Sequence, residues 1–198
     1  MPEKVAVLLF WMAVAAVLLL LHFWGALPYL EFNRALILEH GQWWRIWTGN
    51  WVHLSNAHVL MDTAFMALVA LFLVNRTQVW EGLVLVLLVP LGVGLGLLFF
   101  VPSVGRYAGF SGVDQGLLSY ALIRSWSHDR LLFSVFLVAQ FLRLGYEHSP
   151  FYNPYYMYHA LHAVVAYQAH TFGALAGVCC WLAVLRVRSD KSCAEAAG

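Results

Sequence analysis

Two polar side chains in apolar surroundings are of the types that acyl-transfer chemistry needs. Ser111 lies in Gly109-Phe110-Ser111-Gly112 at the start of an apolar stretch, and His170 lies inside another. Polar groups in hydrocarbon are costly, so they usually face a cavity and mark function. A serine hydroxyl becomes a good nucleophile when a neutral imidazole within hydrogen-bond reach takes its proton. We therefore predict a nucleophile and base pair, in preference to a histidine that merely bonds a nearby carbonyl.

Glycines flank both residues at a spacing that favours close helix packing. Gly112 and Gly116 are four residues apart, as are Gly173 and Gly177, and His170 shares the helical face of Gly173. Small residues at this spacing let two helix backbones touch inside a membrane. We expect the two stretches to pack together and to support the site.

The composition is that of a membrane protein. The chain is 62% hydrophobic and only 11% charged, which lies outside the usual range for a soluble domain. A net charge of +1 offers no basic stripe for phosphates, so we expect no nucleic-acid partner. The lipid bilayer and membrane-anchored proteins are the expected partners. The cysteines, Cys179, Cys180 and Cys193, predict no disulfide framework.

Six apolar stretches predict an all-α bundle of six transmembrane helices. They cover residues 5–24, 57–74, 82–101, 110–123, 131–142 and 160–185. The fourth and fifth are short for a hydrocarbon core of about 30 Å, so each could also be a buried or re-entrant helix. We expect the first to be a retained span, because its apolar core is too long for a signal peptide and no cleavage site follows.

The basic residues favour an orientation with both termini in the cytoplasm. Seven Lys and Arg then lie inside and four outside. His170 would lie ten residues into the sixth stretch, about 15 Å along a helix, at a depth similar to that of Ser111. We expect residues 1–198 to form a single membrane domain, with a core of about 43–185 and a short polar cytoplasmic tail over 186–198.

The motifs together resemble the rhomboid family of intramembrane serine proteases. The GxSG around Ser111 and a histidine followed by Gly173 and Gly177 are similar to the two catalytic motifs of that family. A third block agrees, in which Trp44-Arg45-Ile46-Trp47-Thr48 is followed by His53, His58 and a polar residue at 62. The resemblance runs from about Trp43 to Gly177 and implies a rhomboid-like fold of six helices.

The resemblance also implies a role for each matching residue. Ser111 would attack the scissile carbonyl, and His170 would act first as base and then as acid. His58 and the backbone of Ser111 would form the oxyanion hole, where donors in a dry site stabilise the developing charge. Trp44 and Arg45 would lie in an outer loop at the membrane interface. No cofactor is implied.

Two positions depart from the family pattern. The family commonly has asparagine where this chain has Asp62 in the expected oxyanion hole. An ionised carboxylate would repel an oxyanion, so Asp62 must be protonated, orient His58 or face elsewhere, and we expect burial to keep it neutral. Gln115 replaces a common tyrosine and could bond His170 or a substrate carbonyl, or serve helix packing. Asp114 should have a partner such as His162 or Arg106.

The run Gly109-Phe110-Ser111-Gly112-Val113, followed by Gly116-Leu117, looks like the bacterial rhombosortase branch. That resemblance implies a protein of the bacterial inner membrane that processes membrane-tethered precursors bearing a C-terminal Gly-rich signal. A Gly-rich junction is a natural target, because helical substrate must be unwound before cleavage and glycine makes unwinding easier.

Other functions are disfavoured by particular features. A catalytically silent rhomboid-like protein that binds transmembrane helices would not need both Ser111 and His170. A transporter or channel would be expected to show paired broken helices or internal repeats. A zinc site made from His58, Asp62, His159 and His162 lacks HExxH-type spacing, so no metal is expected.

Overall fold

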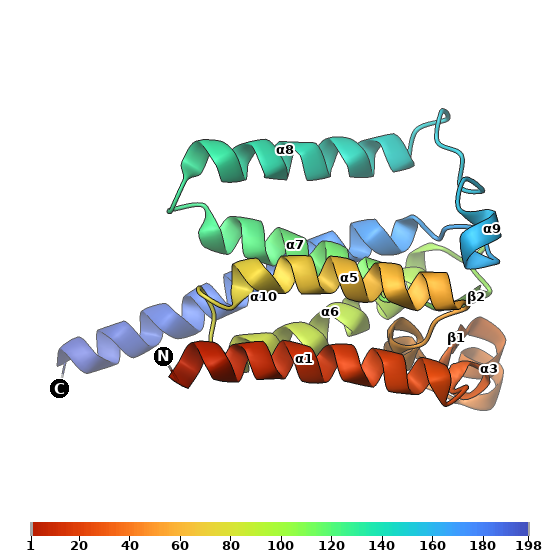
Figure 1. The fold of residues 1–198 in the computed structure, drawn as a ribbon, viewed down its shortest axis with the longest axis horizontal. Coiled ribbons are helices and arrows are strands. Elements are labelled where there is room, and N and C mark those ends of the chain that lie inside the picture. The colour runs from red at the N-terminus through yellow and green to blue at the C-terminus, as the bar shows by residue number, and fades with distance from the viewer. Residues whose placement is uncertain (1, 198) are drawn as a thin grey trace.

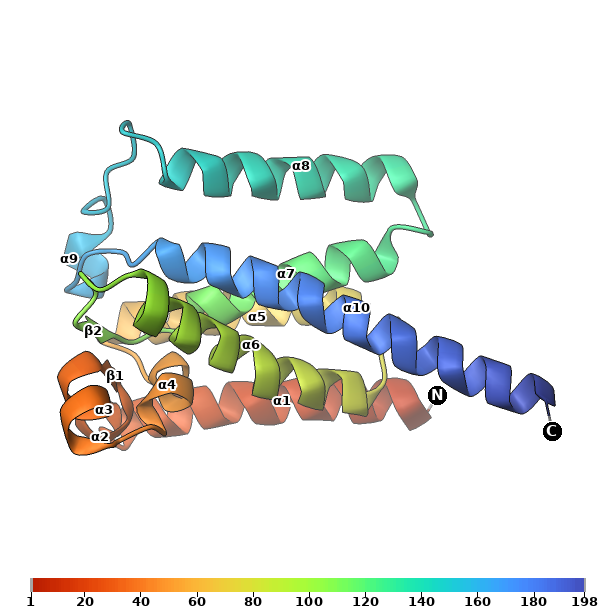
Figure 2. The ribbon, with the colours of Figure 1, turned by 180° about the vertical axis from the view of Figure 1, so that it is seen from behind.

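Six long helices lie alongside one another in the computed structural model, which describes the backbone of residues 2–197 and the side chains of residues 3–188 (Figures 1 and 2). They are α1 (Pro2–Phe23), α5 (Asn56–Leu73), α6 (Val79–Phe100), α7 (Ser111–Ser125), α8 (Arg130–Glu147) and α10 (Gln168–Ala197). Both termini lie toward the same end of the bundle (Figure 1). The side chain of Cys193 and most of the predicted polar tail lie outside the described side chains.

Short elements gather at the opposite end of the bundle. They are α2 (Leu27–Leu30), β1 (Phe32–Asn33), α3 (Arg34–His40), α4 (Arg45–Thr48), the 3-10 helix η1 (Gly49–Trp51), β2 (Arg106–Tyr107) and α9 (Tyr158–Leu161). Strands β1 and β2 are antiparallel, with Phe32 opposite Tyr107 and Asn33 opposite Arg106. This end of the molecule also holds the first residues of α7 and α10 (Figures 1 and 2).

Four of the described helices are long and apolar enough to cross a membrane. They cover Glu3–Phe23, Asn56–Leu73, Val79–Phe100 and Gln168–Arg188. Leucines on their outer faces are exposed, with Leu9 57%, Leu71 63% and Leu87 54% accessible. Exposed apolar surface of this extent would be covered by lipid. Helix α7 has 15 residues and is shorter than these four, as its sequence predicts.

Two predicted boundaries are wrong. Helix α8 extends to Glu147 and is 18 residues long, whereas the sequence predicts an end at Leu142. The sixth long helix begins at Gln168, eight residues later than the predicted start at Ala160. Residues 158–161 form α9 instead, and His162 ends it in a left-handed conformation with φ of 56°. His170 is therefore the third residue of its helix and does not lie ten residues into it.

Helix α10 packs directly on α7 through their glycines. A Cβ atom at Gly173 would overlap the carbonyl oxygen of Gly112, and one at Gly177 would overlap that of Gly116. Backbone atoms cannot move aside as a flexible side chain would, so only glycine permits this approach. The contact brings the first turns of α7 and α10 together.

Ionic contacts hold the same helices at the end near the termini. Glu81 of α6 is fully buried, and its carboxylate contacts Arg188 of α10 together with Arg124 and Tyr120 of α7. A buried carboxylate needs partners of this kind. Charge thus joins α6, α7 and α10 at one end, and close backbone contact joins α7 and α10 nearer the other.

Buried arginine organises the connection between α1 and α5. Arg45 is 5% exposed, and its guanidinium donates to the backbone oxygens of Pro28 and Glu31 at 3.1 and 2.9 Å and to Gln42 Oε1 at 2.6 Å. Arginine suits this role because its planar group carries several donors in a fixed arrangement. Arg45 therefore holds together the loop in which the sequence motif placed it.

Candidate active site

A sharp backbone turn presents Ser111 at the first position of α7. Gly109 has φ of +134°, a conformation that side chains rarely adopt, and a Cβ there would lie 2.6 Å from His58 Nε2. The Phe110 N–H donates to Asp62 Oδ2 at 2.7 Å, and the Tyr107 hydroxyl donates to the Gly109 oxygen at 2.8 Å. Burial raises the pKa of Tyr107, so its hydroxyl remains a hydrogen-bond donor well above neutral pH.

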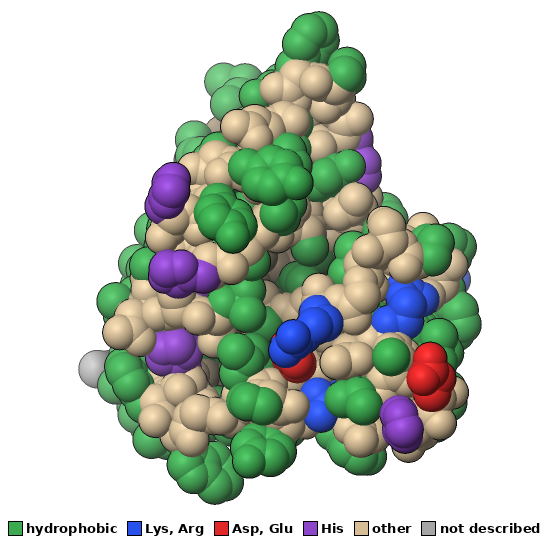
Figure 3. All heavy atoms as spheres, turned by 90° about the vertical axis from the view of Figure 1, so that its right-hand side faces the viewer, with side chains coloured by type: hydrophobic (Ala, Val, Ile, Leu, Met, Phe, Trp, Pro, Cys, Tyr) green, Lys and Arg blue, Asp and Glu red, His purple; other side chains and the backbone are tan. Residues whose placement is uncertain are grey.

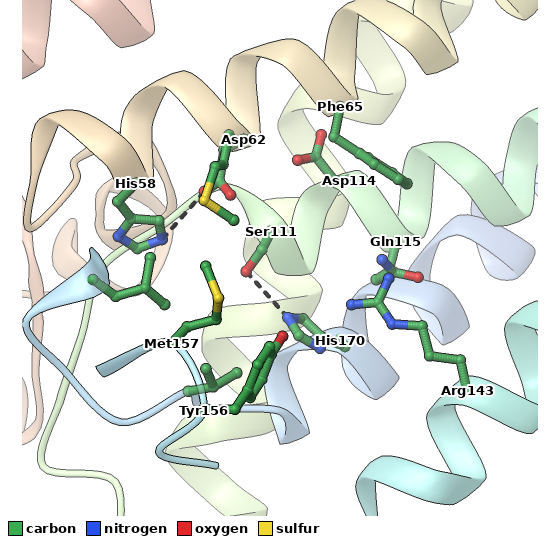
Figure 4. Close-up of a pocket in the computed structure, with 13 residues that line it drawn as sticks. His58, Asp62, Phe65, Ser111, Asp114, Gln115, Arg143, Tyr156, Met157 and His170 are labelled. Atoms are coloured by element: carbon green, nitrogen blue, oxygen red, sulfur yellow. Dashed lines mark hydrogen bonds and ion pairs between the residues drawn. The ribbon is translucent and has the colours of Figure 1, made fainter. Parts of the chain in front are cut away.

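His170 meets Ser111 across the contact between α7 and α10. Its Nε2 atom lies 3.2 Å from Ser111 Oγ, within hydrogen-bond distance. His170 is 4% exposed. Figure 4 shows the serine hydroxyl directed at the ring. The two side chains come from segments 59 residues apart, and the glycine contact described above brings those segments together.

The position of Ser111 places unpaired backbone donors beside its hydroxyl. The first N–H groups of an α-helix have no acceptor within that helix, and the helix dipole makes this end positive. Phe110 N–H is bonded to Asp62, Asp114 N–H is bonded to Phe110 O, and Gly112 N–H interacts with the Tyr107 hydroxyl. Among the described residues, the free donors at this terminus are therefore the N–H groups of Ser111 and Val113. Such a terminus is suited to stabilising an oxyanion formed at a carbonyl attacked by Ser111.

Asp62 lies among the histidines and contacts the turn before Ser111. Its Oδ2 atom lies 3.2 Å from His53 Nε2 and 3.4 Å from His58 Nε2, in addition to the bond from Phe110 N–H. The side chains of His53, His58 and Asp62 are all buried. Of the three roles considered for Asp62, these contacts favour orienting His58. Because Nε2 of His58 faces Asp62, the free ring nitrogen is Nδ1, which has no partner among the described residues.

Gln115 makes a helix-packing contact, one of the roles considered from the sequence, whereas Asp114 lacks the partner expected for it among the described side chains. Gln115 accepts from Gln140 of α8 through its side-chain and backbone oxygens at 3.3 and 3.0 Å, which is a helix-packing role. Asp114 is 2% exposed, and neither of its carboxylate oxygens has a partner among the described side chains. Arg106, one expected partner, binds Glu31 instead.

A cavity of about 250 Å³ opens beside the serine and the histidine. Residues of α5, α7, α8, α10 and the segment around α9 line it: His58, Met61, Asp62, Phe65, Ser111, Asp114, Gln115, Arg143, Tyr156, Met157, Leu161, Val165 and His170 (Figure 4). Figure 3 views the end of the molecule that carries α9, where the surface is hollowed at its centre and histidines gather along one side. Serine, histidine and a space for a peptide are therefore found together.

The segment around α9 is fastened to the helix that carries His58. Ser55 caps α5 by accepting from His58 N–H at 3.1 Å, and its hydroxyl donates to the Ala160 oxygen of α9 at 2.7 Å. Leu161 of α9 lines the cavity. One serine thus starts α5 and holds a wall of the cavity in place.

One residue of the site was missed from the sequence. Glu147 Oε2 lies 2.9 Å from His170 Nδ1, and Glu147 is 3% exposed. The predicted end of the fifth stretch at Leu142 excludes this residue from the helix. The signal that could have found it is an acidic residue close to a membrane stretch, which is costly and needs a partner.

The remaining predicted residues occupy the surroundings of the site. Arg45 is buried in the loop, whereas Trp44 is half exposed. His159 lies within α9, and His162 follows it. Among the residues that the structure describes, no group of three potential ligands is arranged to hold a metal ion.

Comparison with known families adds one finding to this geometry. The Rhomboid domain model matches residues 40–187, which is most of the chain and includes every residue of the pocket described above. A search of curated proteins finds no matching sequence.

Proposed function

This chain belongs to the rhomboid family, and from that premise we propose that it is an active serine endopeptidase using Ser111 and His170. Rhomboids are generally intramembrane serine proteases that act on membrane-embedded substrates. The apolar helices agree with an integral membrane protein. The single observation that carries the proposal is the 3.2 Å separation of Ser111 Oγ and His170 Nε2 at the edge of a cavity.

The proposed reaction is acyl transfer in two steps. The Ser111 proton moves to His170 Nε2 while Oγ bonds to the scissile carbonyl carbon, and the same proton then passes to the leaving amine. The carbonyl oxygen becomes negative and is stabilised by the free N–H groups at the start of α7, with His58 on the cavity wall. Water, activated by the same imidazole, then hydrolyses the acyl-enzyme and restores the serine.

The lining of the cavity supports access for a substrate from the membrane. Met61 and Phe65 lie on α5, and Arg143 lies on α8. A peptide that passes between these two helices would reach Ser111 without crossing the bundle. The peptide must be extended there, because a helix shields its own carbonyl groups. This requirement favours cleavage sites rich in small or helix-breaking residues.

The finer parts of the proposal follow the sequence motifs. The protein would be a single domain of six spans in the bacterial inner membrane, with cytoplasmic termini, and a member of the rhombosortase branch. Its substrates would be membrane-tethered precursors with a Gly-rich C-terminal signal. Incubating purified protein with such precursors and mapping the new termini by mass spectrometry tests this part separately.

A fluorophosphonate probe tests the catalytic part. It phosphonylates an activated serine with loss of fluoride, so protein in lipid discs should be labelled at Ser111. Ser111→Ala and His170→Ala should abolish labelling while they retain the wild-type unfolding temperature within a few degrees. Absence of labelling in folded wild-type protein would refute catalysis and favour the second candidate, a silent rhomboid-like protein that binds transmembrane helices.

A further inference from the structure

Glu147 contacts the nitrogen of His170 that faces away from Ser111. The ring lies between the two side chains, with Nε2 3.2 Å from Ser111 Oγ and Nδ1 2.9 Å from Glu147 Oε2. Glu147 is 3% and His170 4% exposed, so solvent does not screen their contact. Serine, imidazole and carboxylate thus follow one another in a continuous series.

This series has a chemical consequence for the imidazole. An ionised carboxylate can only accept, so the Nδ1 atom bonded to it must carry the proton. The lone pair of a neutral imidazole then lies on Nε2, where it can accept the proton of Ser111. Once that proton arrives, the positive ring faces the negative carboxylate in a buried site, where charge-assisted bonds are strong.

From this geometry, and resting on the proposed function, we propose that Glu147 is a positioning residue that completes a Ser111–His170–Glu147 triad. It holds the ring in the tautomer that a general base needs and offsets the charge that the ring acquires. It takes no proton itself, since the Nδ1 proton stays on the ring throughout.

Arg143 fixes the carboxylate from the other side. Its Nε atom donates to Glu147 Oε1 at 3.2 Å from one turn earlier on α8, while Oε2 faces His170. Each oxygen therefore has its own partner, as a buried carboxylate requires. The guanidinium is partly exposed, so the arginine connects the carboxylate to the cavity that it also lines.

The other carboxylates of the cavity do not reach the ring. Asp62 contacts His53, His58 and the Phe110 N–H, and both oxygens of Asp114 lack partners among the described residues. Glu147 is also carried by α8, which joins α7 through the bond from Gln140 to Gln115. The triad therefore exists only while the end of α8 is docked against α10.

A competing explanation is that the contact between Glu147 and His170 serves only to hold α8 against α10. The structure supplies its control, because His148 Nε2 lies 2.8 Å from Thr171 Oγ1. That contact joins the same two segments, one residue further along each, and touches neither Ser111 nor the ring of His170. Thr171→Val removes this hydrogen bond while preserving side-chain shape. The variant therefore measures how far a contact that only holds α8 against α10 affects the rate.

The kinetic test compares Glu147→Gln with Thr171→Val in lipid discs. Glu147→Gln should slow fluorophosphonate labelling about 100-fold, because the neutral amide cannot balance the charged ring. With a cleavable peptide, kcat should fall while KM stays within twofold, since Glu147 acts through His170. The labelling rate of Thr171→Val should stay within about threefold of the wild-type rate. Equal labelling of folded Glu147→Gln and wild type would overturn the triad and leave the proposed function standing.

A spectroscopic test reads the tautomer in the unsubstituted protein, and a folded variant is needed only to assign the signals. In protein labelled with ¹⁵N-histidine, the His170 signals are those lost in His170→Ala. The triad requires the neutral ring to carry its proton on Nδ1, and a proton on Nε2 would overturn it. If folded wild type failed to react with the probe at all, the proposed function itself would fall.

Discussion

Gly173→Ala should separate the two reacting side chains by a predictable amount. The added Cβ would overlap the carbonyl oxygen of Gly112, and both partners are backbone-fixed atoms. The two helices must therefore move apart locally, by about 1.5 Å, before a normal van der Waals contact is restored. Ser111 Oγ and His170 Nε2 start at 3.2 Å, so the same shift takes them beyond hydrogen-bond distance.

The size of the effect follows from this displacement. Overpacking of a close contact costs about 1–3 kcal/mol of stability. A misplacement of about 1 Å in reacting groups costs roughly 100-fold in rate. We therefore expect fluorophosphonate labelling to slow by about two orders of magnitude, while the unfolding temperature in lipid discs falls by only a few degrees.

Two further glycines provide comparisons for this prediction. Gly177→Ala makes the same kind of overlap with Gly116, four residues and about 6 Å further along α10, so it should cost similar stability but less activity. Gly145 of α8 has nothing within 4 Å of an added Cβ, so Gly145→Ala should preserve both the unfolding temperature and the labelling rate. Wild-type labelling and stability in Gly173→Ala would show that the α7–α10 contact does not set the geometry of the pair.

Two other predictions concern Asp62, which lies beside the site, and Glu81, which lies at the opposite end of the bundle. Asp62→Ala should cost about 1–3 kcal/mol of stability and slow labelling, because Phe110 N–H loses its buried acceptor. Asp62→Asn keeps an oxygen there and should retain more stability and a faster labelling rate, so equal effects in the two variants would contradict this role of Asp62. Glu81→Gln removes the counter-charge of Arg188 and Arg124 and should cost about 1–3 kcal/mol, because both arginines are partly exposed and water can solvate their charge. The labelling rate of folded protein should be unchanged, since the cluster lies at the far end of α7, and a slower rate at unchanged unfolding temperature would refute that separation.

The sequence determined the helices and their class, because apolar runs of about twenty residues have few alternatives to a helix in a bilayer. The starts and ends of α1, α5 and α6 fall within about three residues of their predicted limits. The start of α10 was missed by eight residues, because α9 and the turn at His162 have nearly the same apolar composition as the helix that follows. Hydropathy does not register the left-handed turn at His162 that ends α9.

For the candidate site, the sequence supplied residue types and the glycine spacing, and these pointed to Ser111 and His170 as a pair. Tertiary structure alone decided that their side chains lie 3.2 Å apart. It also decided that Asp62 faces two histidines and that Glu147 reaches the far nitrogen of His170. Contacts between separate helices depend on their rotation and depth in the bundle, which local sequence patterns do not specify. A carboxylate 23 residues from its histidine therefore has no recognisable spacing, and only packing of α8 on the bundle brings them together.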